Sequence, residues 1–267
     1  TGGLGFIGSN FLTLYKDNFK IPREGRKPLT KDILYLISTI HNYHVYDNIN
    51  LDVNTNLNIL CEVLENCRNK DITINFISSW FVYGKTKKMP AKETDRCFPT
   101  GFYSITKKCA EDLLISFCKT FEVNYRIIRL CNILGNNDKG ASRKKNALIW
   151  LINCLKQDLN IDLYDNGDPI RDVLHVDDAC AAIQLICNNS PKNEIYNVGS
   201  GQPTQIKTII ELAKKKLNSK SKINYIKAPT FHKLVQAKDF WMDVKKLRNL
   251  GFTEKYNLDE IVTKLCI

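Results

Sequence analysis

Strand-like and helix-like segments alternate along this chain, and this alternation restricts its fold more than any other feature. Apolar runs rich in β-branched residues occur at 33–38, 72–78, 123–130 and 195–198. Segments with apolar residues at helical spacing occur at 51–67, 103–120, 146–157, 177–188 and 204–217. Because strands that alternate with helices are joined by right-handed crossovers, the pattern predicts an α/β fold with a parallel sheet.

The regular alternation weakens after about residue 134, where polar loops follow. This change predicts a second, smaller lobe over the carboxyl edge of the sheet. We expect the first domain to comprise 1–134, with 172–188 returning to it, and the second lobe to comprise 135–171 and 189–267. With 267 residues, the chain is long enough to bury a full core.

The composition is that of a globular protein with a basic surface, with 39 Lys and Arg against 28 Asp and Glu and a net charge of +11. No apolar run approaches the roughly 20 residues of a membrane span, and residues 1–10 lack the basic head of a secretory signal. We therefore expect neither membrane insertion nor secretion.

The ten cysteines contain no C-x-x-C pair, which favours free thiols in a reducing compartment such as the cytoplasm. The four histidines form no ligand set with neighbouring residues, so we expect no metal.

A glycine pattern at the start of the chain indicates a phosphate-binding loop. Gly2, Gly5 and Gly8 form G-x-x-G-x-x-G and lead into the apolar segment FIGSNFLTLY. Glycines permit a tight turn and close approach of the backbone to a pyrophosphate, and the N-terminus of a helix attracts the anion. A plain glycine-rich turn is the alternative. The pattern begins at Thr1, without the buried strand that such a loop ordinarily follows, so we expect that strand to be absent.

The segment after this loop lacks an expected acidic residue. Dinucleotide-binding folds carry an acid about 20 positions on, which binds the adenosine ribose. Here the segment reads KIPREGRKPLTKD, and Glu24 is the only acid near that spacing. Arg23, Arg26 and Lys27 could hold a 2′-phosphate and favour NADP, or residues could be absent near 20–31. We favour the second explanation.

A second motif places a tyrosine and a lysine on one helix face. Tyr103-Ser-Ile-Thr-Lys107 opens a helical segment, so the phenol and the ammonium lie four residues apart on one side. A neighbouring cation would lower the pKa of the phenol, which is about 10 in water. Upstream, the strand at 72–78 leads into Ser79, so a hydroxyl lies at the carboxyl end of a parallel strand, where ligands bind. Y-x-x-x-K alone is commonly a solvated helix face, but these features in this order argue against coincidence.

With these pieces the chain resembles the extended short-chain dehydrogenase/reductases of the nucleotide-sugar epimerase and dehydratase group. The matching segments cover nearly the whole chain: TGGLGFIGSNF (1–11), SSWFVYG (78–84), ETD (93–95), YSITK (103–107), RLCNILG (129–135), NGDPIRDVLHVDD (166–178), YNVGSG (196–201) and LRNLGF (247–252). The resemblance implies a Rossmann-like doubly wound sheet that binds NAD, with NADP left open, and a C-terminal lobe that binds a nucleoside diphosphate sugar. It also implies a homodimer formed through the helices at 51–67 and 103–120.

The resemblance implies roles for five residues near the cofactor. Ser79 would hydrogen-bond the 4-hydroxyl of the sugar, and Tyr103 would be the general base. Lys107 would lower the pKa of Tyr103 and position the cofactor. The backbone of Phe6 and Ile7 would approach the pyrophosphate.

Four further positions carry expectations from the same resemblance. Ser38 and Thr39 would lie against the cofactor. Asn132 and Arg171 would bind the sugar phosphates, and an ion pair with Asp172 is the alternative for Arg171. The arginine of the R-P-G-D element that the family carries near its C-terminus is not recognisable, and Lys233 or Lys238 would stand in for it.

The residues after Ser79 discriminate between reactions. Dehydratases of this family carry an Asp-Glu pair there, whereas this chain has Trp80 and Phe81, which transfer no protons. We therefore expect a 4-epimerase, then a 4-keto reductase, then a 4,6-dehydratase. A nucleic-acid-binding or regulatory protein on the same scaffold is the non-enzymatic alternative, suggested by the charge and by lysine clusters at 139–145 and 214–222. These clusters lack interleaved aromatic residues, and every expected ligand is an anion, so we disfavour it.

Overall fold

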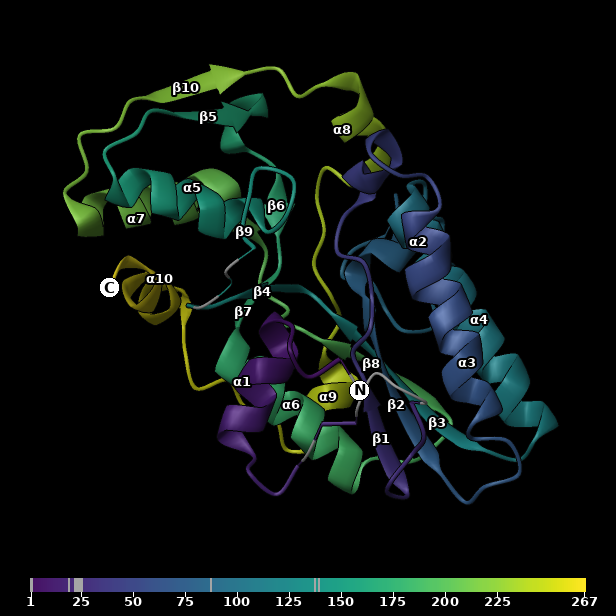
Figure 1. Cartoon of the computed structure of the whole chain (residues 1–267). Coiled ribbons are helices and arrows are strands. Elements are labelled where there is room, and N and C mark those ends of the chain that lie inside the picture. Colours follow the sequence, from purple (N-terminus) through teal and green to yellow (C-terminus); the bar gives the residue numbers. More distant parts are fainter. Residues whose placement is uncertain (1, 19, 22–25, 87, 137, 139) are drawn as a thin grey trace.

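A parallel sheet of four strands forms the centre of the computed structural model, which describes residues 2–18, 20, 21, 26–86, 88–136, 138 and 140–267. Its strands lie in the order β1 (Asp32–Tyr35), β2 (Thr73–Ser79), β3 (Asn124–Leu130) and β8 (Glu194–Val198) (Figure 1). These are the four apolar runs of the sequence, so the predicted α/β fold with a parallel sheet is confirmed. Thr1, Arg23, Glu24 and Lys139, which entered the sequence predictions, lie outside the described residues.

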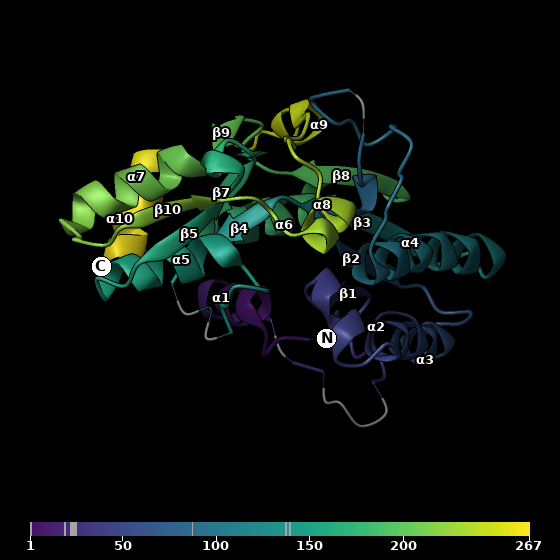
Figure 2. The same cartoon turned by 90° about the horizontal axis from the view of Figure 1, so that it is seen from above.

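Helices cover both faces of this sheet (Figures 1 and 2). One face carries α4 (Phe102–Thr120) and a broken helix made of α2 (Leu51–Val53), the π turn η2 (Asn54–Asn58) and α3 (Ile59–Glu65). The other face carries α1 (Phe6–Leu14) and α6 (Val176–Asn189), which pack against each other. Because side chains alternate along a strand, Ile127 packs into the first layer and Ile128 into the second.

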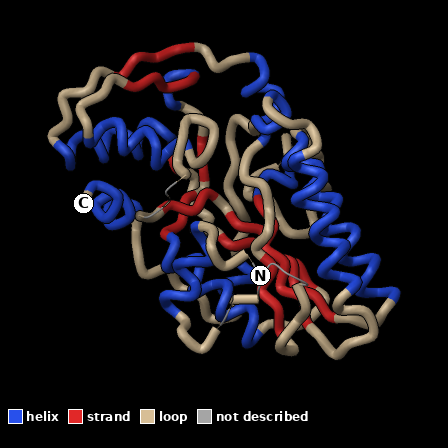
Figure 3. Tube along the Cα trace, viewed as in Figure 1, coloured by secondary structure: helices blue, strands red, loops and turns tan. Residues whose placement is uncertain are grey.

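A second hydrophobic core holds the smaller lobe together. It lies among α5 (Ala147–Lys156), α7 (Ile206–Leu217), α10 (Leu258–Cys266) and β5 (Ile161–Tyr164). Strand β5 pairs in parallel with β10 (Ile223–Ile226), and this ribbon lies above α5 and α7 in Figure 3. The helix expected at 204–217 begins only at Ile206, because Thr204 and Gln205 pair with another strand.

Short elements connect the two parts. Strands β4 (Asn132–Leu134) and β7 (Val173–His175) pair in parallel, and β6 (Ile170–Arg171) and β9 (Thr204–Gln205) pair antiparallel. The remaining helical elements are η1 (Asn42–Tyr46), η3 (Trp80–Tyr83), η4 (Asp165–Gly167), α8 (Thr230–Val235) and α9 (Lys245–Arg248). The predicted domain boundaries stay a prediction. Strand β8, which we assigned to the second lobe as part of 189–267, pairs with β3 in the main sheet.

The ten cysteines are free thiols, and five of them are buried. Among the described residues, no helix is both long enough and apolar enough to cross a bilayer.

Candidate functional site

The glycine loop and the start of α1 form the first wall of the candidate site. Gly5 is the N-cap of α1 and has no side chain to cap it, so the N–H groups of the first turn are open to an anion. Gly8 packs tightly, because a Cβ there would lie 2.7 Å from the Cα of Gly3 and 2.8 Å from the carbonyl oxygen of Gly2. A Cβ on Gly5 would meet no atom closer than 3.7 Å, which leaves space in front of the helix. This geometry suits a bound pyrophosphate.

One cavity of about 450 Å³ brings the predicted cofactor and catalytic residues together. Its lining includes all ten of them: Gly2, Gly5, Phe6, Ile7, Gly8, Ser38, Thr39, Ser79, Tyr103 and Lys107. These residues come from the glycine loop, from the ends of β1 and β2, and from α4, which meet at the carboxyl edge of the sheet. The combination of an open helix N-terminus with this cavity fits a dinucleotide.

Sequence reasoning missed several other residues of this cavity. Asp138, Lys145 and Asn146 reach it from the loop after β4, and Lys145 donates to Asp138 at 2.7 Å. The sequence signals for them were the polar loops after residue 134 and the lysine cluster at 139–145, and neither carried a motif for cofactor binding. Arg26, the residue considered as one alternative for binding a 2′-phosphate, does not line the cavity and pairs with Glu62 of α3.

Ser79, Tyr103 and Lys107 occupy fixed positions around this cavity. Ser79 ends β2 and caps η3, and its hydroxyl accepts the N–H of Phe81 at 3.4 Å. Tyr103 and Lys107 are only 7% and 2% exposed, on the first turns of α4. The Nζ of Lys107 donates to the carbonyl of Ile77 at 2.7 Å, so the ammonium is held against the sheet.

Burial is the main influence on the pKa values of Tyr103 and Lys107. It raises the pKa of Tyr103 to about 12, although hydrogen bonding to Ser79 and Ser38 acts in the opposite direction; the charge of Asp52 raises the pKa further. Burial also lowers the pKa of Lys107 to about 7, against the opposing charge of Glu111. Burial therefore works against the lowering of the Tyr103 pKa that we expected from Lys107.

Asn132 and Arg171 lie outside this cavity and line a neighbouring one of about 180 Å³, together with Trp80 and Phe81. The Nδ2 of Asn132 donates to the carbonyl of Asp172 at 3.0 Å. The two groups of residues that the sequence singled out therefore line two different cavities.

The guanidinium of Arg171 is buried, and within the described part of the chain only its Nη1 makes hydrogen bonds. Its Nη1 donates to the carbonyls of Ile170 and Lys238, each at 2.7 Å, and burial lowers its pKa to about 10. The carboxylate of Asp172 accepts hydrogen bonds from Ser200, Gly201 and Met242 instead. Among the contacts of the described residues, the alternative ion pair between Arg171 and Asp172 is absent.

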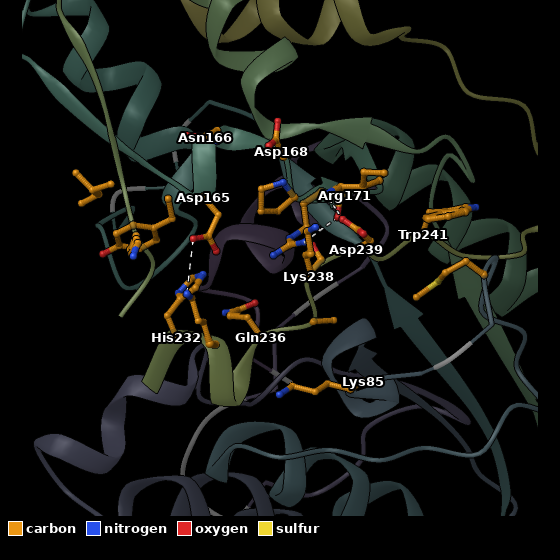
Figure 4. A pocket seen from close by; sticks show the side chains of 18 of the residues that line it. Lys85, Asp165, Asn166, Asp168, Arg171, His232, Gln236, Lys238, Asp239 and Trp241 are labelled. Carbon is orange, nitrogen blue, oxygen red and sulfur yellow. Dashed lines mark hydrogen bonds and ion pairs between the residues drawn. The ribbon is translucent and has the colours of Figure 1, made fainter. Parts of the chain in front are cut away.

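Arg171 also lines a wider cavity of about 1080 Å³ between the lobes (Figure 4). His232 and Gln236, at α8, lie on one side of it, and Lys238 and Asp239 lie near Arg171. Both lysines that we considered as substitutes for the missing arginine, Lys233 and Lys238, line this cavity.

Comparisons with known proteins agree with this geometry. A family model described as "NAD dependent epimerase/dehydratase family" matches residues 31–199. The chain is 24% identical to the ADP-L-glycero-D-manno-heptose-6-epimerase of Brachyspira hyodysenteriae, over 96% of this chain and 92% of that protein. It is 25% identical to a dTDP-4-dehydro-6-deoxyglucose reductase of Escherichia coli, over 88% and 73%. The solved UDP-glucose 4-epimerase of Thermotoga maritima, determined with UDP-glucose, matches with a TM-score of 0.87 at 19% identity, over 99% of this chain and 96% of that one. This last likeness shows a shared Rossmann-type fold.

Proposed function

Since this chain belongs to the NAD-dependent epimerase/dehydratase family, we propose that it is a nucleotide-sugar 4-epimerase that acts through Ser79, Tyr103 and Lys107. One observation carries the proposal: a hydroxyl, a phenol and an ammonium share a cavity with an open helix N-terminus. That set is sufficient for oxidation and reduction at a single carbinol carbon. NAD, the cofactor of the family, would supply the hydride chemistry at that carbon when bound in this cavity.

The three side chains would divide the proton chemistry among them. Tyr103, as the phenolate, removes the proton of the 4-hydroxyl, and Ser79 hydrogen-bonds the same oxygen. Lys107, which is held by the carbonyl of Ile77, places a charge beside the cofactor cavity. After the 4-keto sugar has turned over, C4 would be reduced on its opposite face, and Tyr103 would return the proton to the C4 oxygen. The chain consumes no net reductant in this cycle.

The residues after Ser79 argue against dehydration. Trp80 and Phe81 stack on each other with ring centroids 4.1 Å apart, and Phe81 meets the ring of Tyr103 edge-on at 5.7 Å. Both line the cavity beside Asn132 and Arg171. A 4,6-dehydratase needs groups at these positions that exchange protons at C5 and C6, and two apolar rings offer none.

Incubation with a panel of UDP-, dTDP-, GDP- and CDP-sugars tests this function. We expect NMR to show inversion at C4 of one sugar. The total amount of NADH should stay unchanged. No inversion across the panel with added NAD would contradict the proposal. A Tyr103→Phe sample serves as the control for background isomerisation.

A one-way 4-keto reductase is the second candidate, and the reductase of Escherichia coli among the relatives favours it. It would use the same Ser79, Tyr103 and Lys107, so the site does not distinguish the two reactions. Stoichiometric oxidation of NADPH by a 4-keto sugar, without its reversal, would identify a reductase.

The sugar diphosphate would bind in the cavities between the lobes. We propose that Asn132 and Arg171 contact its phosphates, and that Lys233 and Lys238 add positive charge. An acidic partner already lies near one of them, since the Nζ of Lys233 is 3.9 Å from Asp165.

The lysine clusters provide little support for nucleic-acid binding. In the first cluster Arg143 pairs with Asp162, Lys144 with Asp47 and Lys145 with Asp138, while in the second Lys216 pairs with Asp259. These ion pairs offset part of the positive charge of the two clusters, which weakens the case for binding a phosphate backbone.

We also propose a homodimer through α4 and the neighbouring broken helix. Phe102, Ile105 and Leu113 of α4 are 38%, 48% and 38% exposed, which is unusual for large apolar side chains on one helix. We expect light scattering to give twice the chain mass of 30.7 kDa, and Ile105→Asp to give monomers. Leu159→Asp, at an equally exposed residue of the other lobe, should leave the mass unchanged. A monomeric native protein would contradict this interface.

A cytoplasmic location stays a prediction from the free cysteines.

A further inference from the structure

Three cavities of the structure adjoin one another through residues that they share. The cofactor cavity, which holds Ser79 and Tyr103, has Ile40 and Asn146 in common with the cavity of about 180 Å³. That cavity in turn shares several lining residues with the cavity of about 1080 Å³. We call these shared residues the neck: Tyr164, Pro169, Arg171, His232 and Gln236.

A ligand that extends from Tyr103 into the widest cavity has to pass the neck. A nucleoside diphosphate sugar is such a ligand, because its sugar must reach Tyr103 in the proposed reaction and its nucleoside needs the space of the wide cavity. The diphosphate joins these two ends. It would therefore lie at the neck, between the residues that line it.

Two side chains with nitrogen donors lie at the neck. Arg171 comes from β6 and His232 comes from α8, on the other side of the wide cavity (Figure 4). Burial, and then the charge of Arg171, lower the pKa of His232 to about 4, against the opposing charge of Asp165. The imidazole is therefore neutral at pH 7 and carries a single proton, which lies on either Nδ1 or Nε2.

One ring nitrogen of His232 bonds to a residue that follows β1 of the main sheet. Its Nδ1 lies 2.8 Å from the hydroxyl of Tyr43, in η1. Burial raises the pKa of Tyr43 to about 12, so this phenol keeps its proton at pH 7 and can donate it to Nδ1. When Nδ1 accepts, the proton of the neutral ring lies on Nε2. Among the described residues, Nε2 has no hydrogen-bond partner.

Packing around the pair holds both rings in place. Asn42 of η1 accepts a backbone N–H of α4 at 3.2 Å, which fixes η1 against the main sheet. Phe231 meets the ring of Tyr43 edge-on at 5.2 Å, and Tyr164 meets the ring of His232 edge-on at 5.0 Å. The imidazole therefore has a defined orientation at the neck before a ligand arrives.

We propose that His232 is a substrate-binding residue, whose Nε2–H donates to an oxygen of the diphosphate across from Arg171. Tyr43 is its positioning residue, because the bond from its hydroxyl to Nδ1 keeps the proton on Nε2. With the proton on Nδ1, the ring would instead present a lone pair to the anion and repel it. This inference rests on the proposed function, which supplies the ligand.

Titration calorimetry of the NAD-bound protein with UDP, dTDP, GDP and CDP tests this contact without turnover. For the nucleotide that binds most tightly, His232→Ala should raise the Kd by about tenfold or more, the effect of one hydrogen bond to a charged group. Retained NAD binding shows that a variant is folded, since His232 does not line the cofactor cavity. An unchanged Kd, or no binding of any of the four nucleotides to the native protein, would overturn the proposal.

Two isosteric substitutions distinguish the contact with the ligand from the contact with Tyr43. The amide nitrogen of glutamine can occupy the place of Nε2, whereas the amide of asparagine can occupy the place of Nδ1. His232→Gln should therefore recover part of the lost affinity, and His232→Asn should bind as weakly as His232→Ala. A residue that only joined α8 to η1 would give the reverse order. Native affinity in His232→Asn, or no recovery in His232→Gln, would contradict the contact.

The positioning role of Tyr43 has its own matched control. Tyr43→Phe should raise the Kd by about two- to tenfold, and it should have no further effect in a His232→Ala background. Tyr46→Phe is the control, because its ring also meets Phe231 edge-on, at 4.8 Å, but is 65% exposed. Tyr46→Phe should bind like the native protein. Equal Kd values for the two phenylalanine variants would refute the positioning role.

The binding data and the sugar panel fail independently of each other. If the Kd values follow this pattern while no sugar is inverted at C4, the contact stands and the proposed reaction fails. If a sugar is inverted and His232→Ala binds its nucleotide like the native protein, the contact fails alone.

Discussion

Tyr103→Phe should lower kcat by a factor of about 10² to 10⁴, the usual contribution of a positioned general base. The ring stays in place, because it is 7% exposed and packs against Phe81, and only the ionisable oxygen is lost. Binding of NAD should change little, since the other residues of the cavity are untouched. C4 inversion followed by NMR measures the rate, and quenching of intrinsic fluorescence measures the binding.

A matched tyrosine provides the control for this substitution. Tyr35 is fully buried in β1, and within the described part of the chain its hydroxyl has no hydrogen-bond partner. Tyr35→Phe should therefore fold and turn over like the native protein. If Tyr103→Phe keeps more than a tenth of the native kcat, Tyr103 is not the base.

Arg129→Met should lower the free energy of unfolding by about 3–5 kcal/mol, because it leaves a carboxylate buried without its partner. Arg129 of β3 and Glu111 of α4 are bonded twice, at 2.7 and 3.0 Å, and their side chains are 3% and 1% exposed. The guanidinium also lies over the ring of Tyr83, 4.7 Å from its centroid. Urea denaturation with and without the substitution measures the loss.

Two further variants distinguish the free-energy cost of leaving a buried charge without a partner from the cost of losing an ion-pair contact. Arg129→Met combined with Glu111→Met replaces both charges by apolar side chains and should recover most of the lost stability. Arg68→Met, which breaks an exposed pair with Glu65 at 2.6 Å, should cost less than about 1 kcal/mol. A similarly small loss for Arg129→Met would contradict the interpretation of the buried pair.

The sequence predicted those parts of the fold and site that depend on local spacing. The four strands of the main sheet were recognisable as β-branched runs, and Tyr103 and Lys107 share a helix face because they are four residues apart. Ser79 was recognisable because it ends a buried strand of a parallel sheet. To predict these features, one needs to know only the residue repeat of a helix or strand and the direction in which the strands run.

Contacts between distant segments were not predictable in this way. Asn56 meets Ser38 and Thr106 only after the sheet and α4 have assembled, and nothing in NTNLN signals a π turn. The carbonyl that holds Lys107 belongs to β2, 30 residues earlier in the chain. The pKa of Tyr103 also escaped prediction, because burial depends on everything packed around it.

The two bonds from Arg171 to carbonyls of its own chain have a thermodynamic consequence for ligand binding. A free arginine samples many rotamers, and an anion that captures it must offset the entropy lost when the side chain is ordered. Arg171 is already held by Ile170 and Lys238 at 2.7 Å and is 6% exposed. An anion that reaches this guanidinium therefore binds to a cation whose ordering was completed when the chain folded.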